Sequence, residues 1–454
     1  MPNTTGGETK NNAATELLEF INTAPTPFHT VAALKTMLQN AGAQEIALSD
    51  IKAPLDAEKL YYTVFGDACL AAFIPGKSLE NGVRIGAAHL DYPVLKIKSA
   101  APSKKSAGIE RLNVEVYGGT IQHTWLDRPL KIAGRVYYKD ALENISYADI
   151  TSGDHTFIIP SVAIHMLRDV NDNAHFSVQN ELLPFFCILP ASSEKEETPE
   201  AGFLRWLAET VSSAVKEPVS TDCILSFDLS VYDGMPACFA GMQNEFLSAP
   251  GLDDRAMIHA LFSSICEVSA GSNSPGTPAI AFAFHHEECG SLSHTGARSA
   301  FVSGLTKALC SLHGCDTETG FLGVMQRSAA FSADMAHATH PAYESKSDPG
   351  IPIRLGGGPV LKASANQSYA TSPAASAFFV ALCKSNEIPF QQFANHSDAR
   401  GGGTIGPMLS AALGIPVTDI GNPMLAMHAV REFCAASDQE AMQKLFRSFF
   451  RETT

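Results

Sequence analysis

A strand-length apolar segment that ends in two adjacent glutamates constrains this chain more than any other feature. Residues 279–284 (AIAFAF) carry no polar side chain, and His285-His286-Glu287-Glu288 follows directly. Such a run is typical of a buried strand, and open α/β sheets bind ligands at the carboxyl ends of their strands. Two neighbouring carboxylates repel each other unless a cation or a shared proton lies between them. The segment therefore predicts an α/β sheet in which one Glu binds a metal and the other acts as a base.

The net charge limits the partners that this chain can have. The 454 residues include 32 Lys and Arg and 47 Asp and Glu, which gives a net charge of −15. This charge disfavours nucleic acid and anionic membranes, and no apolar run is long enough to cross a bilayer. We therefore expect no nucleic acid and no membrane partner. An acidic substrate would need a local positive charge at its site.

The cysteines and the amino-terminal residues predict a cytoplasmic location. Ten cysteines are scattered along the chain without a Cys-x-x-Cys pair, so a thiolate zinc site is not expected. The first residues are polar and lack an apolar signal region. A reducing compartment, with the cysteines as small core residues, is the simplest interpretation.

Strand-like and helical patterns alternate near both ends of the chain. Apolar runs at residues 70–74 and 83–88 predict strands, and periodic segments at residues 254–268, 296–312 and 373–385 predict helices. This alternation is typical of an α/β domain.

The middle of the chain has a different pattern of apolar and polar side chains. Residues 94–98 and 113–117 alternate apolar and polar side chains, as half-buried β-strands do. A chain of 454 residues is also long enough for two domains. We predict a catalytic domain built from residues 1–92 and 236–454, with a β-rich domain, residues 93–235, inserted between them.

Five places combine His, Asp or Glu with the end of an apolar run or with a turn. Imidazoles and carboxylates suit zinc, and manganese or cobalt are alternatives. A site for two metals needs a bridging carboxylate and terminal His and Asp or Glu ligands. Singly, each place has an ordinary explanation, such as a helix cap, a buried core histidine or a solvated acidic face. The five places are His89 with Asp91, Asp253 with Asp254, Glu287 with Glu288, Asp334, and His428.

A series of different short motifs extends along nearly the whole chain, from PTPFH at residues 25–29 to HAVRE at residues 428–432. The strongest lie at residues 118–128, 286–291, 332–337, 358–362, 366–367, 404–407 and 425–428. As an ordered series they resemble the M18 metallopeptidase family, the aspartyl aminopeptidases. The resemblance implies a zinc-peptidase-like mixed sheet flanked by helices, with an inserted β-rich dimerisation domain.

The resemblance also implies a set of metal ligands. His89 and Asp334 would bind one divalent ion and Glu288 and His428 the other, with Asp253 bridging them. The two ions would most simply be zinc, with manganese or cobalt as alternatives.

Two more residues would act beside the metals. Glu287 would be the general base, which removes a proton from metal-activated water and returns it to the leaving amine. Asp91, two residues beyond His89, would orient that imidazole. The substrate would be a peptide with a free N-terminus.

Three residues would contact the substrate if the resemblance holds. Lys362 would attract an acidic first side chain, although it could also be a surface lysine. His337 could contact the substrate or serve in packing or capping. His165, in the insert, would reach the active site of a neighbouring subunit, or be a buried structural histidine. The family forms large homo-oligomers, typically dodecamers, and the same is expected here.

The sequence also departs from the family pattern. Tyr92 and His285 replace the usual residues and could change the shape or the pH response of the pocket, and Asp254 replaces a usual Asn.

The leading hypothesis is therefore a dinuclear metal aminopeptidase that prefers N-terminal Asp or Glu. The alternatives are the same chemistry on neutral N-terminal residues, and a catalytically silent subunit used for assembly or cargo. Retention of Glu287 and of every proposed ligand argues against the silent subunit.

Overall fold

A large mixed sheet forms the centre of the molecule. The computed structural model describes residues 12–52, 54–172, 175–189, 200–271, 276–399 and 401–452. The sheet has nine strands in the order β1-β2-β3-β15-β4-β16-β20-β18-β19. They are β1 (Gln44–Glu45), β2 (Tyr61–Val64), β3 (Leu70–Ile74), β4 (Arg84–His89), β15 (Ala279–Phe284), β16 (Ala329–Ala333), β18 (Val360–Lys362), β19 (Gln391–Phe393) and β20 (Val417–Gly421).

Strand β15 is buried on both faces, as its apolar sequence predicts. It pairs parallel with β4 and antiparallel with β3. Successive side chains of a strand point to opposite faces, and here each face enters a different core. Ala279, Ala281 and Ala283 join one cluster, and Ile280, Phe282 and Phe284 join the other. Because both faces are covered by helices, the strand contains no polar residue.

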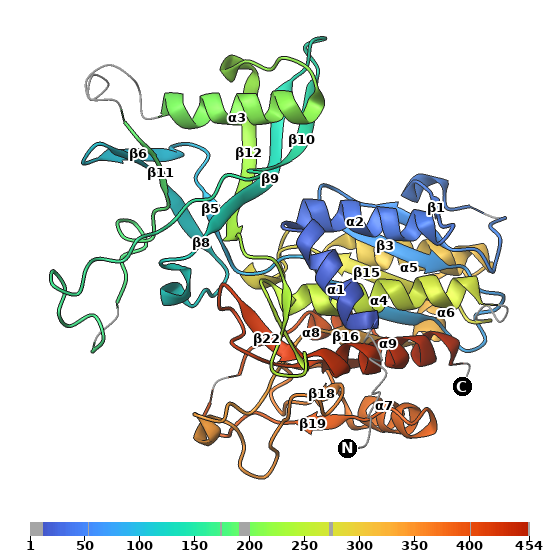
Figure 1. The fold of residues 1–454 in the computed structure, drawn as a ribbon. Helices are drawn as coiled ribbons and strands as arrows, with labels where there is room; N and C mark the ends of the chain where they lie inside the picture. Colours follow the sequence, from blue (N-terminus) through green and yellow to red (C-terminus); the bar gives the residue numbers. More distant parts are fainter. Residues whose placement is uncertain are drawn as a thin grey trace, which may run out of the picture.

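Helices cover both sides of the sheet (Figure 1). One side carries α1 (Asn12–Thr23), α2 (Pro27–Asn40), α4 (Leu252–Ala270), α7 (Pro373–Ser385) and α9 (Ala436–Arg451), and the other carries α5 (Ala300–Leu312), α6 (Glu318–Met325) and α8 (Gly406–Leu413).

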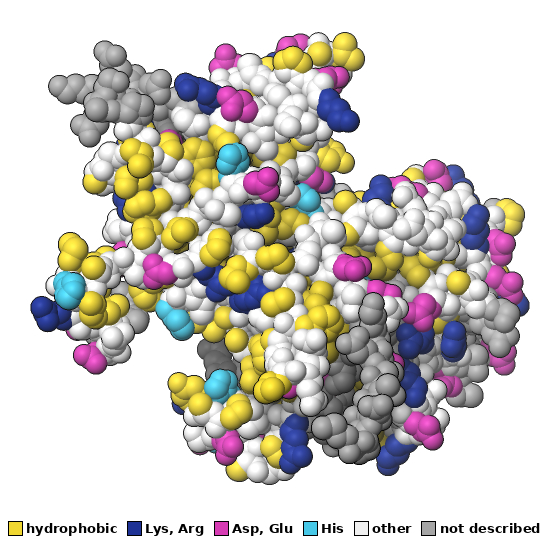
Figure 2. All heavy atoms as spheres, viewed as in Figure 1, with side chains coloured by type: hydrophobic (Ala, Val, Ile, Leu, Met, Phe, Trp, Pro, Cys, Tyr) yellow, Lys and Arg dark blue, Asp and Glu magenta, His cyan; other side chains and the backbone are white. Residues whose placement is uncertain are grey.

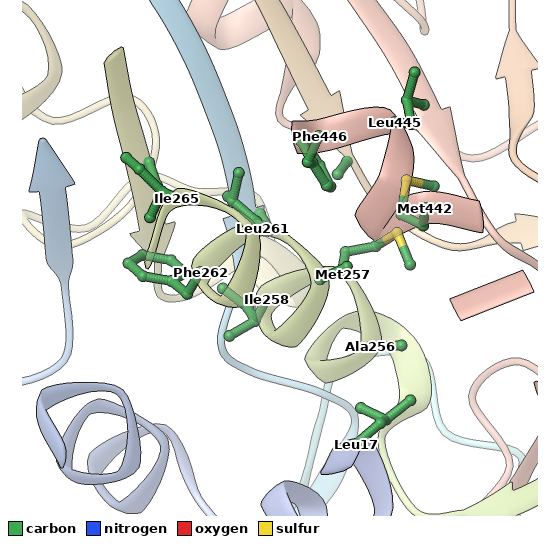
Figure 3. Packing of buried hydrophobic residues seen from close by; sticks show 14 of the residues in the cluster. Leu17, Ala256, Met257, Ile258, Leu261, Phe262, Ile265, Met442, Leu445 and Phe446 are labelled. Carbon is green, nitrogen blue, oxygen red and sulfur yellow. The ribbon is translucent and has the colours of Figure 1, made fainter. Parts of the chain in front are cut away.

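Helix α4 lies closest to the middle of the sheet and packs against α9. Figure 3 shows Met257 and Leu261 of α4 beside Met442 and Phe446 of α9. A Cβ atom at Gly86 of β4 would lie 2.3 Å from a methyl group of Leu261. The glycine therefore allows the close contact between α4 and β4 that brings the first turn of α4 near the carboxyl end of β4.

The insert, residues 93–235, lies to the upper left of the large sheet in Figure 1. It contains two sheets, with strand orders β10-β9-β12-β5-β8 and β11-β7-β6. Their strands are β5 (Val94–Ile97), β6 (Ser103–Ser106), β7 (Ile109–Leu112), β8 (Val114–Tyr117), β9 (Leu130–Lys139), β10 (Ile145–Thr151), β11 (Phe185–Ile188) and β12 (Ile224–Asp233).

The insert also contains a helix that the sequence analysis did not predict. Helix α3 (Glu200–Val215) buries Phe203, Leu207 and Val211 against the strands of the insert. These residues recur every four positions, which is a helical spacing, but the surrounding strand patterns obscured it.

A further five-stranded sheet lies at the edge of the cavity described below. Its order is β13-β14-β22-β21-β17. The strands are β13 (Cys238–Ala240), β14 (Phe246–Ala249), β17 (Ala336–His337), β21 (Pro423–Leu425) and β22 (Glu432–Ala435). Short 3-10 turns are η1 (Leu48–Asp50), η2 (Gln122–Trp125), η3 (Thr221–Cys223), η4 (Glu287–Cys289) and η5 (Glu344–Lys346).

The predicted element boundaries need two corrections. The strand expected at residues 83–88 is Arg84–His89, so His89 belongs to the strand itself. The helix expected from residue 296 begins at Ala300, because main-chain hydrogen bonds at Gly296 and Ser299 form turns before it. None of the helices in the described ranges combines the length and the apolar character that a bilayer span requires.

Candidate active site

A cavity of about 400 Å³ opens at the carboxyl ends of β4, β15 and β16. Eight of the residues singled out from the sequence line it. They are His89, Asp253, Glu287, Glu288, Asp334, His337, Lys362 and His428.

The register of the parallel strands brings three of these positions to one level. His89, the last residue of β4, pairs with Phe284 of β15, so η4 with its two glutamates follows at the same edge. Ser332 of β16 pairs with Ala87 of β4, which puts Asp334 level with His89. The carboxyl ends of parallel strands meet at one edge of a sheet, and this places the acidic residues together.

Asp253 lies between the two histidines. It comes from the first turn of α4, and its peptide bond to Asp254 is cis. Its Oδ1 is 3.3 Å from Nε2 of His89, and its Oδ2 is 3.7 Å from Nε2 of His428. Nε2 of His428 is also 3.4 Å from Oε2 of Glu288. One carboxylate therefore presents a different oxygen to each histidine.

The donor atoms of this cluster suit a divalent metal ion. Three groups of His and carboxylate atoms each lie within 4.8 Å of one another: His89 with Asp253, Asp254 and Asp334; His89 with Glu287 and Glu288; and Asp253 with Glu288 and His428. Oδ1 of Asp253 and Oδ1 of Asp254 are buried without a hydrogen-bond partner. Buried carboxylate oxygens without a donor are costly, and a cation among them would remove that cost.

The protonation of the cluster supports the same conclusion. Burial and the nearby Asp334 raise the pKa of Glu287 to about 8, and burial and Asp253 raise the pKa of Glu288 to about 11. Burial raises the pKa of Asp334 to about 6, although Lys362 opposes the rise. These carboxylates can all be ionised near neutral pH only if additional positive charge enters the cavity.

Asp91 lies behind the cavity and holds the two glutamates. Its Oδ1 accepts a hydrogen bond from the main-chain N–H of Glu287 at 3.1 Å, and its Oδ2 accepts one from Glu288 at 3.1 Å. Nδ1 of His89 lies 3.0 Å from the main-chain oxygen of Asp91 and 3.7 Å from its Oδ1. Asp91 therefore contacts His89 mainly through its main chain, and its carboxylate is directed to η4.

Lys362 and His337 also line the cavity. The buried ammonium of Lys362 donates to the main-chain oxygens of Asp334 at 2.8 Å and Met335 at 3.2 Å, and Oδ1 of Asp334 is 3.8 Å away. Burial would lower the pKa of Lys362, but Asp334 raises it, so the side chain stays charged. His337, on β17, is exposed.

The remaining residues singled out from the sequence lie away from the cavity lining. His165 is exposed in the insert. The hydroxyl of Tyr92 donates to the main-chain oxygen of Pro25 at 2.7 Å. His285 stacks on His286, with ring centroids 3.7 Å apart, behind Asp91. The substrate contact proposed for His165, and the effects on pocket shape and pH response proposed for Tyr92 and His285, stay predictions.

Comparison with known proteins identifies the family. A family model described as aminopeptidase I zinc metalloprotease (M18) matches residues 20–450. The chain belongs to the M18 aminopeptidase family. A probable M18 family aminopeptidase 2 from Clostridium novyi is 36% identical over 96% of this chain and 98% of its own length. An aspartyl aminopeptidase 1 from Schizosaccharomyces pombe is 33% identical, over 97% and 95% of the two chains.

Solved structures of M18 aminopeptidases have the same fold. The match in the cryo-EM structure of an Ape4 and Nbr1 complex has a TM-score of 0.92 at 31% identity and covers 98% of this chain and 87% of the other. A dodecamer of mApe1 from S. cerevisiae matches with a TM-score of 0.81 at 25% identity, over 97% of each chain. The predicted mixed α/β fold is confirmed, and the protein is a metallo-aminopeptidase, a hydrolase.

Two carboxylates of this M18 aminopeptidase support the site without having been assigned a role from the sequence. Glu432 is buried, and its two oxygens accept from the main-chain N–H groups of Asp253 at 3.0 Å and His428 at 2.7 Å. Oδ2 of Asp254 accepts from the N–H of His89 at 3.1 Å. The sequence contained a clue to both residues, since each is an acidic residue that closely follows a proposed metal ligand in the chain.

Proposed function

We propose that this M18 enzyme is a dinuclear aminopeptidase that removes N-terminal Asp or Glu from peptides. His89 and Asp334 would hold one divalent ion and Glu288 and His428 the other, with Asp253 between them. The observation that carries this proposal is the position of Asp253, whose two oxygens face His89 and His428 separately. Two bound divalent ions, most simply zinc with manganese or cobalt as alternatives, would activate water and polarise the scissile carbonyl.

Glu287 is the general base in this proposal. It would take the proton of the attacking water on a carboxylate oxygen and return that proton to the leaving amine. Its main-chain N–H donates to Oδ1 of Asp91 at 3.1 Å. This bond fixes the main chain from which the Glu287 side chain extends at the cavity wall. Asp91 acts through this contact and through its main-chain oxygen beside His89.

Lys362 and His337 are proposed to contact the substrate. Lys362 brings a positive charge to the cavity of a chain whose net charge is −15, and this would favour an acidic first side chain. The aspartyl aminopeptidase among its relatives supports the same preference. Because the ammonium already donates to Asp334 and Met335, a preference for neutral N-terminal residues is the alternative.

The insert is proposed to join subunits into a homo-oligomer. Its surface exposes large hydrophobic side chains at Ile158, Val162, Ile164 and Met166. Figure 2 shows hydrophobic side chains on the visible face of the region that Figure 1 assigns to the insert. Exposed apolar patches of this kind mark interaction sites, and a dodecamer of mApe1 is among the structural neighbours. His165 lies within this exposed segment, which supports its proposed action in a neighbouring subunit.

We also propose that residues 1–92 and 236–454 form the catalytic domain and residues 93–235 the oligomerisation domain. The strands of the nine-stranded sheet lie outside the insert, and those of the β10-β9-β12-β5-β8 sheet lie inside it. All ten cysteines are free thiols, which fits the proposed cytoplasmic location.

A scan of N-terminal residues tests the proposed activity. The purified chain, supplied with zinc, is given short peptides that differ only in their first residue, each as a free amine and as an acetylated form. We expect hydrolysis of free-amine peptides alone, fastest for Asp and Glu, with loss of activity in chelator and recovery on adding metal. Hydrolysis of acetylated peptides at the same rate would overturn the aminopeptidase assignment.

The same scan separates the alternatives. Equal rates for acidic and neutral residues would support the neutral-substrate enzyme, and bound zinc without any hydrolysis would support a silent assembly or cargo subunit. Lys362→Met should lower the ratio of acidic to neutral cleavage, and an unchanged ratio would exclude Lys362 from substrate selection.

A further inference from the structure

A turn of the insert reaches into the active site of its own chain. It consists of residues 117–121 and begins with the last residue of β8. A Cβ atom on Gly118 would lie 3.2 Å from Cβ of Glu288, and one on Gly119 would lie 3.2 Å from Nδ1 of His428. Gly118 also has a φ of +73°, which other residues rarely adopt. The two glycines therefore let the main chain of the insert pack against two proposed metal ligands.

The same turn makes hydrogen bonds to both sides of the site. The hydroxyl of Tyr117 donates to Oδ2 of Asp91 at 2.6 Å. On the other side, the main-chain oxygen of Gly119 lies 3.1 Å from Nδ1 of His428, and the N–H of Ile121 donates to the main-chain oxygen of His428 at 2.9 Å. Residues 117–121 thus contact Asp91, which holds Glu287 and Glu288, and they also contact His428.

The contact between Tyr117 and Asp91 limits how the two glutamates can move. Oδ2 of Asp91 accepts from both Tyr117 and the N–H of Glu288, while its Oδ1 accepts from Glu287. A hydrogen bond to a carboxylate is among the stronger ones in proteins. With the Tyr117 hydroxyl in place, the carboxylate cannot rotate without breaking a bond, so η4 is held in one orientation.

We propose that Tyr117 is a positioning residue, through which the insert sets the orientation of Glu287 and Glu288 in its own subunit. The inference rests on the proposed roles of Glu287 as base and Glu288 as metal ligand. It gives the insert a part in catalysis within one chain, separate from its proposed part in joining subunits.

A purely structural contact would have a different effect from a positioning contact. If Tyr117 only docked the insert, its loss would lower stability and leave metal binding and turnover unchanged. Tyr62 provides a matched control, because it is buried and its hydroxyl also donates to a carboxylate, Oε2 of Glu45 at 3.0 Å. Tyr62 lies on β2 and is not one of the residues that line the cavity.

The test compares Tyr117→Phe and Tyr62→Phe in the full-length, zinc-loaded protein. Zinc release to a chromogenic chelator, kcat and KM on the best peptide, and the thermal midpoint are measured for each. For Tyr117→Phe we expect zinc release to become about tenfold faster and kcat to fall about tenfold, with KM within about twofold, as for other residues that orient metal ligands. Tyr62→Phe should leave zinc release and kcat within about twofold of wild type.

A second variant addresses the other end of the turn. Gly119→Ala leaves the Tyr117 hydroxyl in place and adds a methyl group 3.2 Å from Nδ1 of His428, so zinc release should also become faster. The proposal is overturned if Tyr117→Phe changes neither zinc release nor kcat, or if Tyr62→Phe changes them equally. If the wild type lacks aminopeptidase activity, the proposed function fails, and the zinc-release comparison still decides the role of Tyr117.

Discussion

The two halves of the active site are built in different ways. His89 is the last residue of a strand of the central sheet, Glu287, Glu288 and Asp334 follow two other strands, and the pairing of β4, β15 and β16 sets their level. We call these residues the strand half. Asp253 and His428 form the loop half, because one starts a helix and the other follows a short strand.

The loop half is not aligned by strands of the central sheet, and a buried carboxylate links its two residues instead. Glu432 accepts from the N–H groups of both Asp253 and His428, which are 175 residues apart in sequence (428 minus 253). The strand half owes its geometry to many main-chain bonds, and the loop half owes its geometry to a few side-chain bonds. Single substitutions should therefore affect the loop half mainly through metal binding, and the strand half through chemistry at Glu287, metal binding at its ligands, or overall stability.

The largest expected effect is on chemistry in the strand half. Glu287→Gln should lower kcat about 10²- to 10⁴-fold, because the amide cannot accept a proton. Zinc content, measured by atomic absorption, should stay at the wild-type level. Glu288→Gln is the matched comparison and should lose zinc as well as activity. A Glu287→Gln enzyme with near-wild-type kcat would remove Glu287 from the mechanism.

The next effect tests the claim that the sheet supports the strand half. Phe282 of β15 is fully buried, and Phe282→Ala should lower the free energy of unfolding by about 3–5 kcal/mol, measured by urea denaturation. Leu292, which is 75% exposed, is the control, and Leu292→Ala should change stability by no more than about 0.5 kcal/mol. A similar loss for both variants would show that burial in β15 is not what holds this region.

A smaller effect is expected where Glu432 holds the loop half. Burial and Asp253 raise the pKa of Glu432 to about 8. In Glu432→Gln one oxygen becomes an NH₂ group, which cannot accept from Asp253 or His428. Zinc affinity, measured by chelator competition, should fall about 10- to 100-fold. Glu440→Gln, on the exposed face of α9, is the control. Unchanged zinc affinity in Glu432→Gln would mean that the loop half does not depend on this carboxylate.

The smallest effect concerns the helix that carries Asp253. Burial lowers the pKa of His259 on α4 to about 4, below the unfolded value of about 6.5. As pH falls through this window the unfolded chain binds the proton first, so stability is lost between pH 6.5 and 4. From pH 7 to pH 5 this group should contribute a loss of about 2 kcal/mol.

Urea denaturation at both pH values measures this contribution. His259→Gln should make the pH dependence shallower by about that amount, whereas His294→Gln, at an exposed position, should not. Equal pH dependence in wild type and His259→Gln would show that water reaches His259 and that the packing of α4 is looser than the structure indicates.

Local patterns made much of the fold and of the site predictable. The apolar run of β15, the acidic pair after it and the ordered motifs lie in short stretches of chain, and the residues proposed from them line one cavity. Helix α3 was missed because its buried residues lie among strand patterns. Tyr117 received no role because its partner Asp91 lies 26 residues away in sequence. Glu432 lies close to His428 in sequence, but its second partner, Asp253, is 179 residues away, so its part in joining the two was not visible.

The sequence by itself determined that residues 279–284 form a buried strand and that an acidic pair follows it. The reason is that the length of an apolar run and the spacing of its side chains depend only on residues that are neighbours in the chain. It also determined membership of the M18 family. Only the tertiary structure decided which oxygen of Asp253 faces which histidine, that Asp91 holds η4, and that Lys362 donates to Asp334 and Met335. These contacts join segments that are distant in the chain, so they depend on how every helix and strand packs.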